Sequence, residues 1–227
     1  MIEQAVYGSF PFWNRGYAVL SRSSGCRPEW LAALKQASQR YGERPPGVAE
    51  AQAMFARKIE RGPWMIVGVA PQGEDDAGRP GALAFHALFV GSWSYLRAGA
   101  DPFSFAGLHR REWSPDDLVT TLPSPSLDVR ASTEDSDEGS SETIAQAITA
   151  GRQVVVPSAG PIDVLAQAVW KRLTLRVRLR ASVATWAFDN ANRFDLVAMP
   201  RLSAAGRVSS EMVLGADLGG TQRPVPL

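Results

Sequence analysis

The chain of 227 residues offers few side chains for acid–base or nucleophilic chemistry, because it contains two histidines and one cysteine. His86 interrupts the apolar run Gly81–Val90, which predicts a buried strand. A histidine in such a strand is either a catalytic or ligand-binding group, or a core residue whose nitrogens meet a backbone carbonyl and a nearby side chain. We favour the core interpretation. His109 lies in the polar stretch Leu-His-Arg-Arg-Glu-Trp, so we expect it to be exposed.

Motifs for metal binding and nucleophilic catalysis are missing from the sequence. The two histidines lie 23 positions apart, and neither a His-x-x-x-His nor a Cys-x-x-Cys pair occurs. The sequence also lacks a Gly-x-Ser-x-Gly elbow and the glycine-rich phosphate-binding loops. Cys26 precedes Arg27, whose charge could lower the pKa of the thiol, but a buried or merely surface cysteine is the commoner case. The sequence therefore predicts no metal and no cofactor.

The densest charge feature is a basic run near the C-terminal end. Between Leu173 and Leu179, Leu and Val alternate with Thr and Arg, which favours a strand over a continued helix. In an extended chain the arginines would project from one face about 6.5–7 Å apart. Such a row protects a sheet edge, binds an acidic protein, or contacts nucleic-acid phosphates, and we favour edge protection. The candidate binding residues are Lys171, Arg172, Arg176, Arg178 and Arg180.

Composition sets the broad class of protein. The chain is 45% hydrophobic and long enough for one large domain. Its 24 basic and 23 acidic residues give a net charge of +1, which argues against bulk attraction to nucleic acid or membranes. The lone cysteine favours a reducing compartment. The start of the chain does not resemble a signal peptide, and no apolar run approaches the ~20 residues of a membrane helix, so we expect a cytoplasmic protein.

The pattern of apolar residues predicts a single α+β domain over residues 1–200, with a mixed or mainly antiparallel sheet and peripheral helices. We expect strands at 2–7, 17–21, 64–70, 81–90, 153–156, 184–188 and 194–199. We expect helices at 28–41, 48–61, 141–150 and 162–173, and short helices within 92–122. The acidic, Ser- and Pro-rich segment 116–142 is predicted to be a flexible loop, and residues 201–227 a mobile tail.

Several short segments resemble the first type of N-terminal domain found in bacterial GTPase-associated proteins. The opening Gln4-Ala-Val-Tyr-Gly8 is similar to the family's first strand, and Gly16–Ser23 to its second. The most diagnostic stretch is Arg79-Pro-Gly-Ala-Leu-Ala-Phe-His-Ala-Leu-Phe89, a turn leading into a strand with a histidine. Trp170, Trp186-Ala-Phe188 and Phe194–Pro200 resemble the closing helix and strands. The motif residues of the first and central strands are Tyr7, Gly8, Arg79, Pro80, Gly81 and His86.

The resemblance covers about residues 2–200 and includes one departure. Family members carry Gly-His just before the second strand, whereas this chain has Asn14-Arg-Gly16. The resemblance implies association with a GTPase or ATPase partner in NTP-dependent conflict or immunity systems. It implies no established catalytic activity.

Three functions remain open on the sequence. We favour a non-enzymatic adaptor that binds protein partners in a bacterial defence or signalling assembly. The second possibility is a hydrolase or nuclease-like enzyme that uses His86 with a carboxylate or serine brought near by folding. The third is a nucleic-acid-binding accessory that uses Arg176, Arg178 and Arg180.

Overall fold

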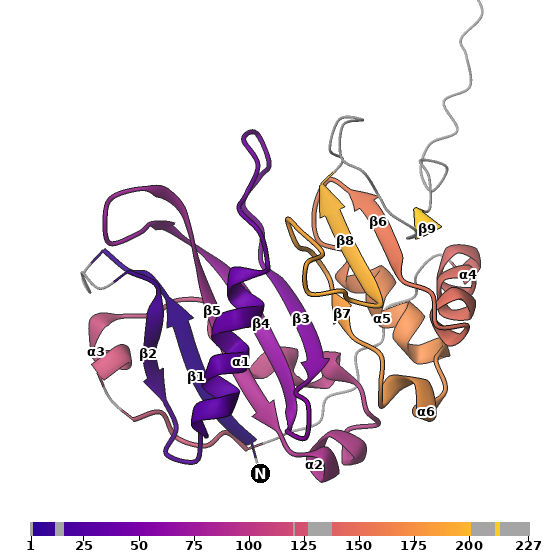
Figure 1. The fold of residues 1–227 in the computed structure, drawn as a ribbon, viewed down its shortest axis with the longest axis horizontal. Coiled ribbons are helices and arrows are strands. Elements are labelled where there is room, and N and C mark those ends of the chain that lie inside the picture. Colours follow the sequence, from indigo (N-terminus) through magenta and orange to yellow (C-terminus); the bar gives the residue numbers. More distant parts are fainter. Residues whose placement is uncertain (1, 12–15, 120, 127–137, 201–211, 214–227) are drawn as a thin grey trace, which may run out of the picture.

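The computed structural model describes residues 2–11, 16–119, 121–126, 138–200 and 212–213, arranged as Figure 1 shows. One mixed β-sheet carries helices on both faces, which confirms the predicted α+β class. The strands are β1 (Ile2–Gly8), β2 (Ala18–Arg22), β3 (Ala53–Lys58), β4 (Trp64–Glu74), β5 (Pro80–Val90), β6 (Val154–Ser158), β7 (Val183–Ala184), β8 (Leu196–Pro200) and β9 (Met212–Val213). The helices are α1 (Pro28–Gln39), α2 (Ser92–Arg97), the 3-10 helix η1 (Pro102–Leu108), α3 (Pro115–Val119), α4 (Glu138–Thr149), α5 (Asp163–Arg172) and α6 (Leu175–Arg178).

The sheet has an antiparallel half and a parallel half. Within the described residues its strand order is β2-β1-β5-β4-β3-β7-β8-β6-β9. The strands from β2 to β7 in this order pair antiparallel. The pairs β7–β8, β8–β6 and β6–β9 are parallel, and in Figure 1 this half is drawn in orange to yellow.

Strand β5 is central, as its apolar sequence predicts. It pairs with β1 on one side and with β4 on the other. Phe85 and Phe89 point into the core cluster that contains α1, whereas Leu88 and Val90 point into the cluster that contains α2, η1, α4 and α5. Both faces of β5 are therefore covered, so a polar side chain on this strand must find its partners inside the protein.

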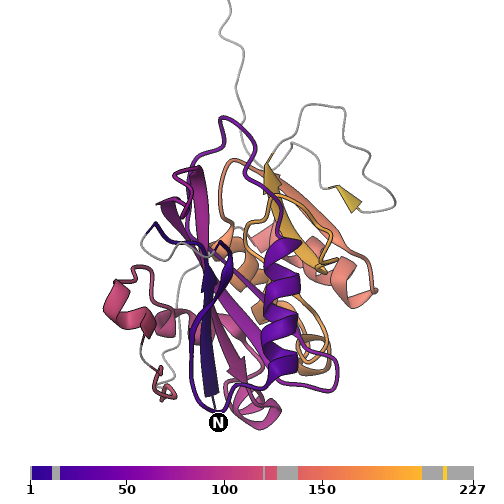
Figure 2. The same ribbon diagram turned by 60° about the vertical axis from the view of Figure 1, so that its left-hand side comes forward.

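Helix α1 covers one face of the sheet, as Figures 1 and 2 show. Pro28 lies in the first turn, and Leu34 and Ala37 are buried against the strands. The chain leaves the helix at Gly42, whose φ of +91° suits glycine. A Cβ atom there would lie 2.9 Å from the backbone carbon of Phe188, so close packing also requires a glycine at this position.

The predicted helix at 48–61 is wrong, because this segment contains strand β3 instead. Phe55 faces the cluster with α1, whereas its neighbours Met54 and Ala56 face the opposite cluster. Alternation over two apolar faces, together with pairing to β4 and β7, overrides the helix preference of the alanine-rich sequence.

The predicted strand at 173–179 is also wrong. Residues Leu175–Arg178 form the single helical turn α6, and the Oγ1 atom of Thr174 caps it by accepting a hydrogen bond from the backbone N–H of Val177. Only Val177 points into the core, while Leu175 is 48% exposed. The alternating pattern therefore does not reflect two faces of a strand.

Of the predicted strand at 184–188, only Ala184 lies in a strand, as the second residue of β7. It pairs parallel to β8, so the turn residues Asp189–Asn192 do not connect a hairpin. The connecting segment lies on the sheet face that carries α1, where Trp186 and Phe194 are buried and the N–H of Phe188 donates to the carbonyl of Tyr41.

Two segments predicted to be flexible are only partly described. The segment 116–142 begins inside α3 and ends inside α4, while its residues 120 and 127–137 lie outside the described residues. In the predicted tail, only Met212 and Val213 are described, as β9 beside β6. None of the helices in the described part of the chain is long and apolar enough to cross a membrane.

Candidate functional site

His86 is fully buried in β5, where its two ring nitrogens are both hydrogen-bonded. Its Nδ1 accepts from the backbone N–H of Arg110 at 3.0 Å, so its Nε2 carries the proton and donates to Oε1 of Gln4 at 2.7 Å. Burial, helped by the nearby His109 and Arg110, holds the pKa of His86 well below its usual value. The imidazole is therefore neutral and fully engaged, which agrees with the core interpretation.

His109 is not exposed as the polar sequence around it predicted. It is half-buried, and its ring lies edge-on to that of His86 with the centroids 5.4 Å apart. The ring rests on Gly68, where a Cβ atom would come within 2.7 Å of the imidazole. Burial lowers the pKa of His109 to about 4, although the backbone of His86 acts in the opposite direction. His109 is accordingly neutral at physiological pH.

The surroundings of the two histidines do not form a catalytic arrangement. His86 contacts the edge of the Trp113 ring at 5.0 Å, and the guanidinium of Arg110 lies over that indole at 4.8 Å. Within the described residues, no carboxylate or serine forms a hydrogen bond with His86. Sequence reasoning missed Gln4, whose amide in turn donates to the carbonyl of Pro123. Its only signal was a polar side chain in a short strand that is otherwise apolar except for Glu3.

The Arg-Pro-Gly motif builds the turn between β4 and β5. The carboxylate of Asp75 accepts from the backbone N–H of Arg79 at 2.8 Å and pairs with its guanidinium at 2.7 Å. Pro80 begins β5, and Gly81 has a φ of +89° that favours glycine. These residues have structural roles, although Arg79 and Pro80 are exposed at the turn.

The paired motif residues Tyr7 and Gly8 are also structural. The ring of Tyr7 lies 6.2 Å from that of Phe85 and 5.8 Å from that of Tyr17. A Cβ atom on Gly8 would lie 2.9 Å from the ring of Phe10 and 3.3 Å from the carbonyl oxygen of Leu83. The aromatic-glycine pair therefore serves packing between neighbouring strands.

The basic residues do not form the predicted row. Arg178 donates to the carbonyls of Leu173, Lys171 and Gly99 at 2.9, 2.7 and 3.3 Å. Arg172 binds Ser141 and Glu142, and Arg180 donates to the carbonyl of Thr149. Arg176 is exposed and forms no hydrogen bond or ion pair with the described residues. Helix geometry thus separates the arginines, and their role in binding stays a prediction.

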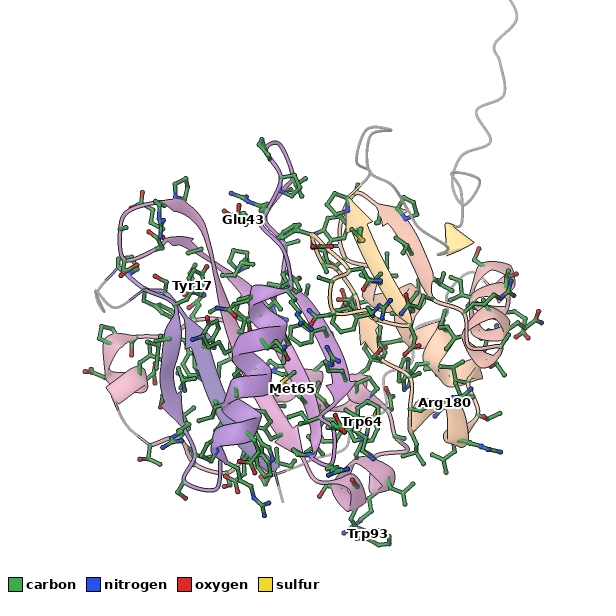
Figure 3. The ribbon with its side chains drawn as sticks, viewed as in Figure 1. Tyr17, Glu43, Trp64, Met65, Trp93 and Arg180 are labelled. Atoms are coloured by element: carbon green, nitrogen blue, oxygen red, sulfur yellow. The ribbon has the colours of Figure 1, made fainter. Side chains whose placement is uncertain are left out.

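Helix α2 places one aromatic side chain inward and another outward. Tyr95 is fully buried, and its ring stacks on that of Trp64 with the centroids 4.2 Å apart. Trp93, by contrast, is 71% exposed, and Figure 3 shows it pointing away from the fold at one end of the molecule. Leu96, three residues further along the helix, is exposed as well. The sequence predicts short helices within 92–122, but residue type alone does not show which side of a short helix is covered.

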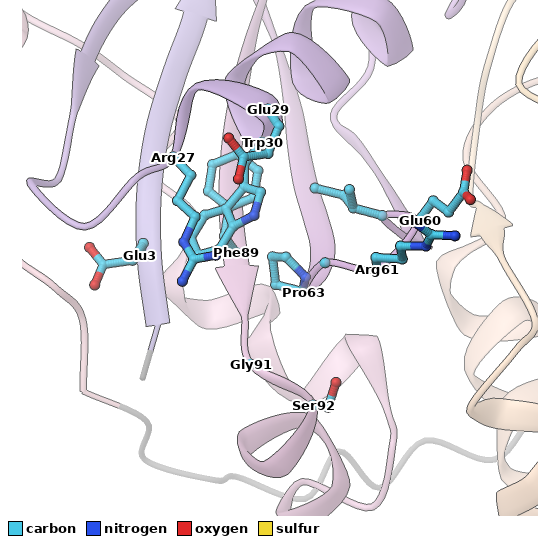
Figure 4. A pocket seen from close by; sticks show the side chains of 12 residues that line it. Glu3, Arg27, Glu29, Trp30, Glu60, Arg61, Pro63, Phe89, Gly91 and Ser92 are labelled. Carbon is cyan, nitrogen blue, oxygen red and sulfur yellow. The ribbon is translucent and has the colours of Figure 1, made fainter.

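A pocket with an aromatic floor lies next to the start of α2. It has a volume of about 320 Å³, and Gly91 and Ser92, which precede Trp93, form part of its wall. Trp30 and Phe89 lie together in it, 5.6 Å apart, and the guanidinium of Arg27 lies 5.4 Å from the centre of the Trp30 ring. Figure 4 shows these side chains on one side of the pocket, with Pro63, Glu60 and Arg61 across from them.

Four charged side chains that line this pocket form no salt bridges with the described residues. Arg27, Glu29, Glu60 and Arg61 line it and are exposed, and none of them forms a salt bridge with the described residues. Unpaired charges around apolar groups are typical of the margin of a protein-binding surface. The pocket and Trp93 together are therefore the best candidate for a functional site.

The lone cysteine and the acidic residues suggest no other site. Cys26 is buried, and its thiol lies 3.3 Å from the carbonyl oxygen of Gln4. Burial raises the pKa of the thiol, which disfavours the reactive thiolate. The described part of the chain contains no group of three or more His, Cys, Asp or Glu placed to hold a metal ion.

Comparisons with known proteins do not identify a family. No protein-family model matches the chain, and no curated protein matches it significantly in sequence. The resemblance to the N-terminal domain of GTPase-associated proteins therefore rests on the sequence motifs alone and stays an expectation.

Proposed function

We propose that this domain is a non-enzymatic adaptor that binds protein partners through the end of the molecule where Trp93 lies. The observation that carries the proposal is the 71% exposure of Trp93 beside a pocket with an aromatic floor. Tryptophan and arginine are the residues most enriched in the energetic centres of protein interfaces, and this surface offers both. The indole of Trp93 makes no ring contact with the described residues, so packing within the domain does not account for it.

The geometry at His86 counts against the enzyme alternative. A general base must accept a proton from substrate, but the only ring nitrogen of His86 that can accept is already bonded to the N–H of Arg110. Its lowered pKa and full burial act in the same direction. The nucleic-acid alternative is weakened because Arg178 bonds to backbone carbonyls within the fold.

The resemblance adds the nature of the assembly to this proposal. It implies that the partner is a GTPase or ATPase component of a bacterial defence or signalling system in the cytoplasm. The structural contribution is narrower, namely a surface with an aromatic anchor and unpaired charges at which such a partner could dock.

Affinity purification followed by mass spectrometry tests the proposal. The wild-type domain, Trp93→Ala and the control Val164→Ser would each be used as bait in a lysate of the native cells. Val164 is also an exposed apolar residue, at 43%, but lies on α5. We expect the same specific proteins with wild type and Val164→Ser, a GTPase or ATPase among them, and their loss with Trp93→Ala. Recovery of the same proteins by all three baits would overturn the proposal.

A further inference from the structure

We infer that the partner contributes an acidic segment with large apolar side chains, which docks on the surface formed by α2 and α6. This inference rests on the proposed adaptor function and adds the chemistry of the partner. The docking surface consists of the apolar side chains of Trp93, Leu96 and Leu175 and the basic side chains of Arg97 and Arg176, with Lys171 added from the end of α5, all exposed.

The two helices lie at the same end of the molecule, and a hydrogen bond connects α6 to the segment that follows α2. Figure 1 shows α2 and α6 beside each other at the lower end of the fold. The guanidinium of Arg178, in α6, donates to the carbonyl of Gly99 just after α2. Residues far apart in the sequence thus contribute to one surface.

The charge of this surface is positive. Arg97 lies in the last turn of α2, and Arg176 in α6. Neither forms a hydrogen bond or ion pair with any described residue, so both guanidinium groups are available to a partner. The carboxylate of Asp101, which follows α2, is half-buried and accepts from the backbone N–H of Phe103. A partner that complements this surface must carry negative charge.

The apolar side chains distinguish a protein segment from other polyanions. Binding to single-stranded nucleic acid needs a series of aromatic rings on which bases stack, and Trp93 is the single exposed ring among these residues. A membrane surface binds amphipathic helices of several turns, whereas α2 and α6 comprise 6 and 4 residues. An acidic segment with an aromatic or aliphatic anchor satisfies both the exposed indole and the unpaired arginines.

Selection from a random peptide library tests the inference. Phage-displayed peptides of about 16 residues, enough for roughly four helical turns, would be selected on the wild-type domain after depletion on Trp93→Ala. We expect the enriched peptides to be net negative and to contain aromatic or large aliphatic residues. Enrichment of neutral or basic peptides, or of none, would overturn the inference.

The affinity of the best peptide then separates the charge from the aromatic anchor. For wild type, we expect Kd to rise about tenfold between about 50 mM and 500 mM salt, because screening weakens the ionic contacts. In the double variant Arg97→Gln, Arg176→Gln, we expect weaker binding at low salt and little salt dependence. The matched control Lys35→Gln, Arg40→Gln removes two exposed charges near or on α1 and should behave as wild type.

Two outcomes distinguish the inference from the adaptor proposal beneath it. If Trp93→Ala abolishes partner binding but the arginine variant keeps the affinity and salt dependence of wild type, the acidic partner is excluded and the adaptor function stands. If a single-stranded oligonucleotide or phosphatidylglycerol vesicles bind more tightly than the peptides, and do so through Trp93, both statements fail.

Discussion

At the residue scale, His86 is held by two hydrogen bonds, and the one that its Nδ1 accepts from the N–H of Arg110 requires the neutral ring. Protonation would place a hydrogen on Nδ1, where the N–H of Arg110 now donates, and would leave a buried charge beside His109 and Arg110. For His109, burial alone favours the neutral form and lowers the pKa to about 4. The histidine pair is therefore stable in the neutral state and costly to acidify.

This arrangement predicts an acid-sensitive fold. The pKa of both histidines lies lower in the folded protein than the usual 6.5, so the unfolded chain binds more protons as the pH falls below 6.5. The free energy of unfolding should thus decrease between pH 6.5 and about pH 5, with each histidine contributing a slope of up to about 1.4 kcal/mol per pH unit. Chemical unfolding at a series of pH values measures this slope.

The variant His86→Gln isolates the contribution of one ring. At about pH 8 we expect its free energy of unfolding to be lower than that of wild type by about 1–3 kcal/mol. The reason is that the buried partners of the imidazole, Gln4 and the N–H of Arg110, lose their hydrogen bonds to it. Its slope below pH 6.5 should be shallower than that of wild type. The raised pKa values of Asp101 and Asp163 act in the opposite direction in both proteins, so the difference between the slopes is the informative quantity. Unchanged stability with loss of an enzymatic activity would instead identify His86 as catalytic.

The sequence could predict the core role of His86 but not its partners. Its position in an apolar run implies burial, and burial requires hydrogen bonds. Gln4 and Arg110 lie 82 and 24 positions away, and strand pairing and chain folding bring them to the ring. His109 was placed wrongly because polar neighbours suggested exposure, whereas its own ring packs on Gly68.

At the element scale, Arg178 connects α5, α6 and the end of α2 through backbone carbonyls. It donates to Lys171, Leu173 and Gly99, whereas its neighbour Arg176 contacts none of the described residues through hydrogen bonds or ion pairs. Two arginines of similar sequence context therefore differ in their role. One stabilises the arrangement of the helices, and the other is available for binding.

This difference predicts different effects of the same substitution. Arg178→Gln should lower the free energy of unfolding by about 1–2 kcal/mol, because it removes hydrogen bonds donated by a charged group. Arg176→Gln should change it by less than about 0.5 kcal/mol, as is usual for an exposed residue. Thermal and chemical unfolding of the two variants provide the comparison. Equal effects from both would contradict the assignment of Arg178 to helix contacts.

Helices and strands whose apolar residues follow a regular helical or strand spacing could be predicted from the sequence. Elements that depend on contacts with residues distant in the sequence could not. Helix α1 and strands β4 and β5 follow from local spacing of apolar residues. Strand β3 depends on pairing with β4 and β7, and α6 on a Thr174 cap that interrupts an apparent alternation. The exposed side of α2 could not be predicted either. It is set by the packing of Tyr95 against Trp64 and Phe105, which lie outside the helix.

At the scale of the whole molecule, the two candidate regions serve different purposes. His86 lies in β5, within the antiparallel half of the sheet, and His109 follows η1 and packs on Gly68 of β4. Trp93 and the unpaired arginines lie at one end, outside both core clusters. With a net charge of +1, the chain has no general attraction for a charged partner. Recognition of a charged partner would therefore depend on a local surface, and we propose α2 with α6 for this role.

Hydrogen–deuterium exchange of the native complex is the most direct measurement of this claim. The domain would be compared alone and bound to the partner recovered by affinity purification. We predict that binding slows backbone exchange in residues 91–98 and 174–180, the segments that contain α2 and α6. The strand around His86 should exchange slowly in both states, because its backbone pairs on both sides. Protection confined to other surfaces, with unchanged exchange in α2, would contradict the account.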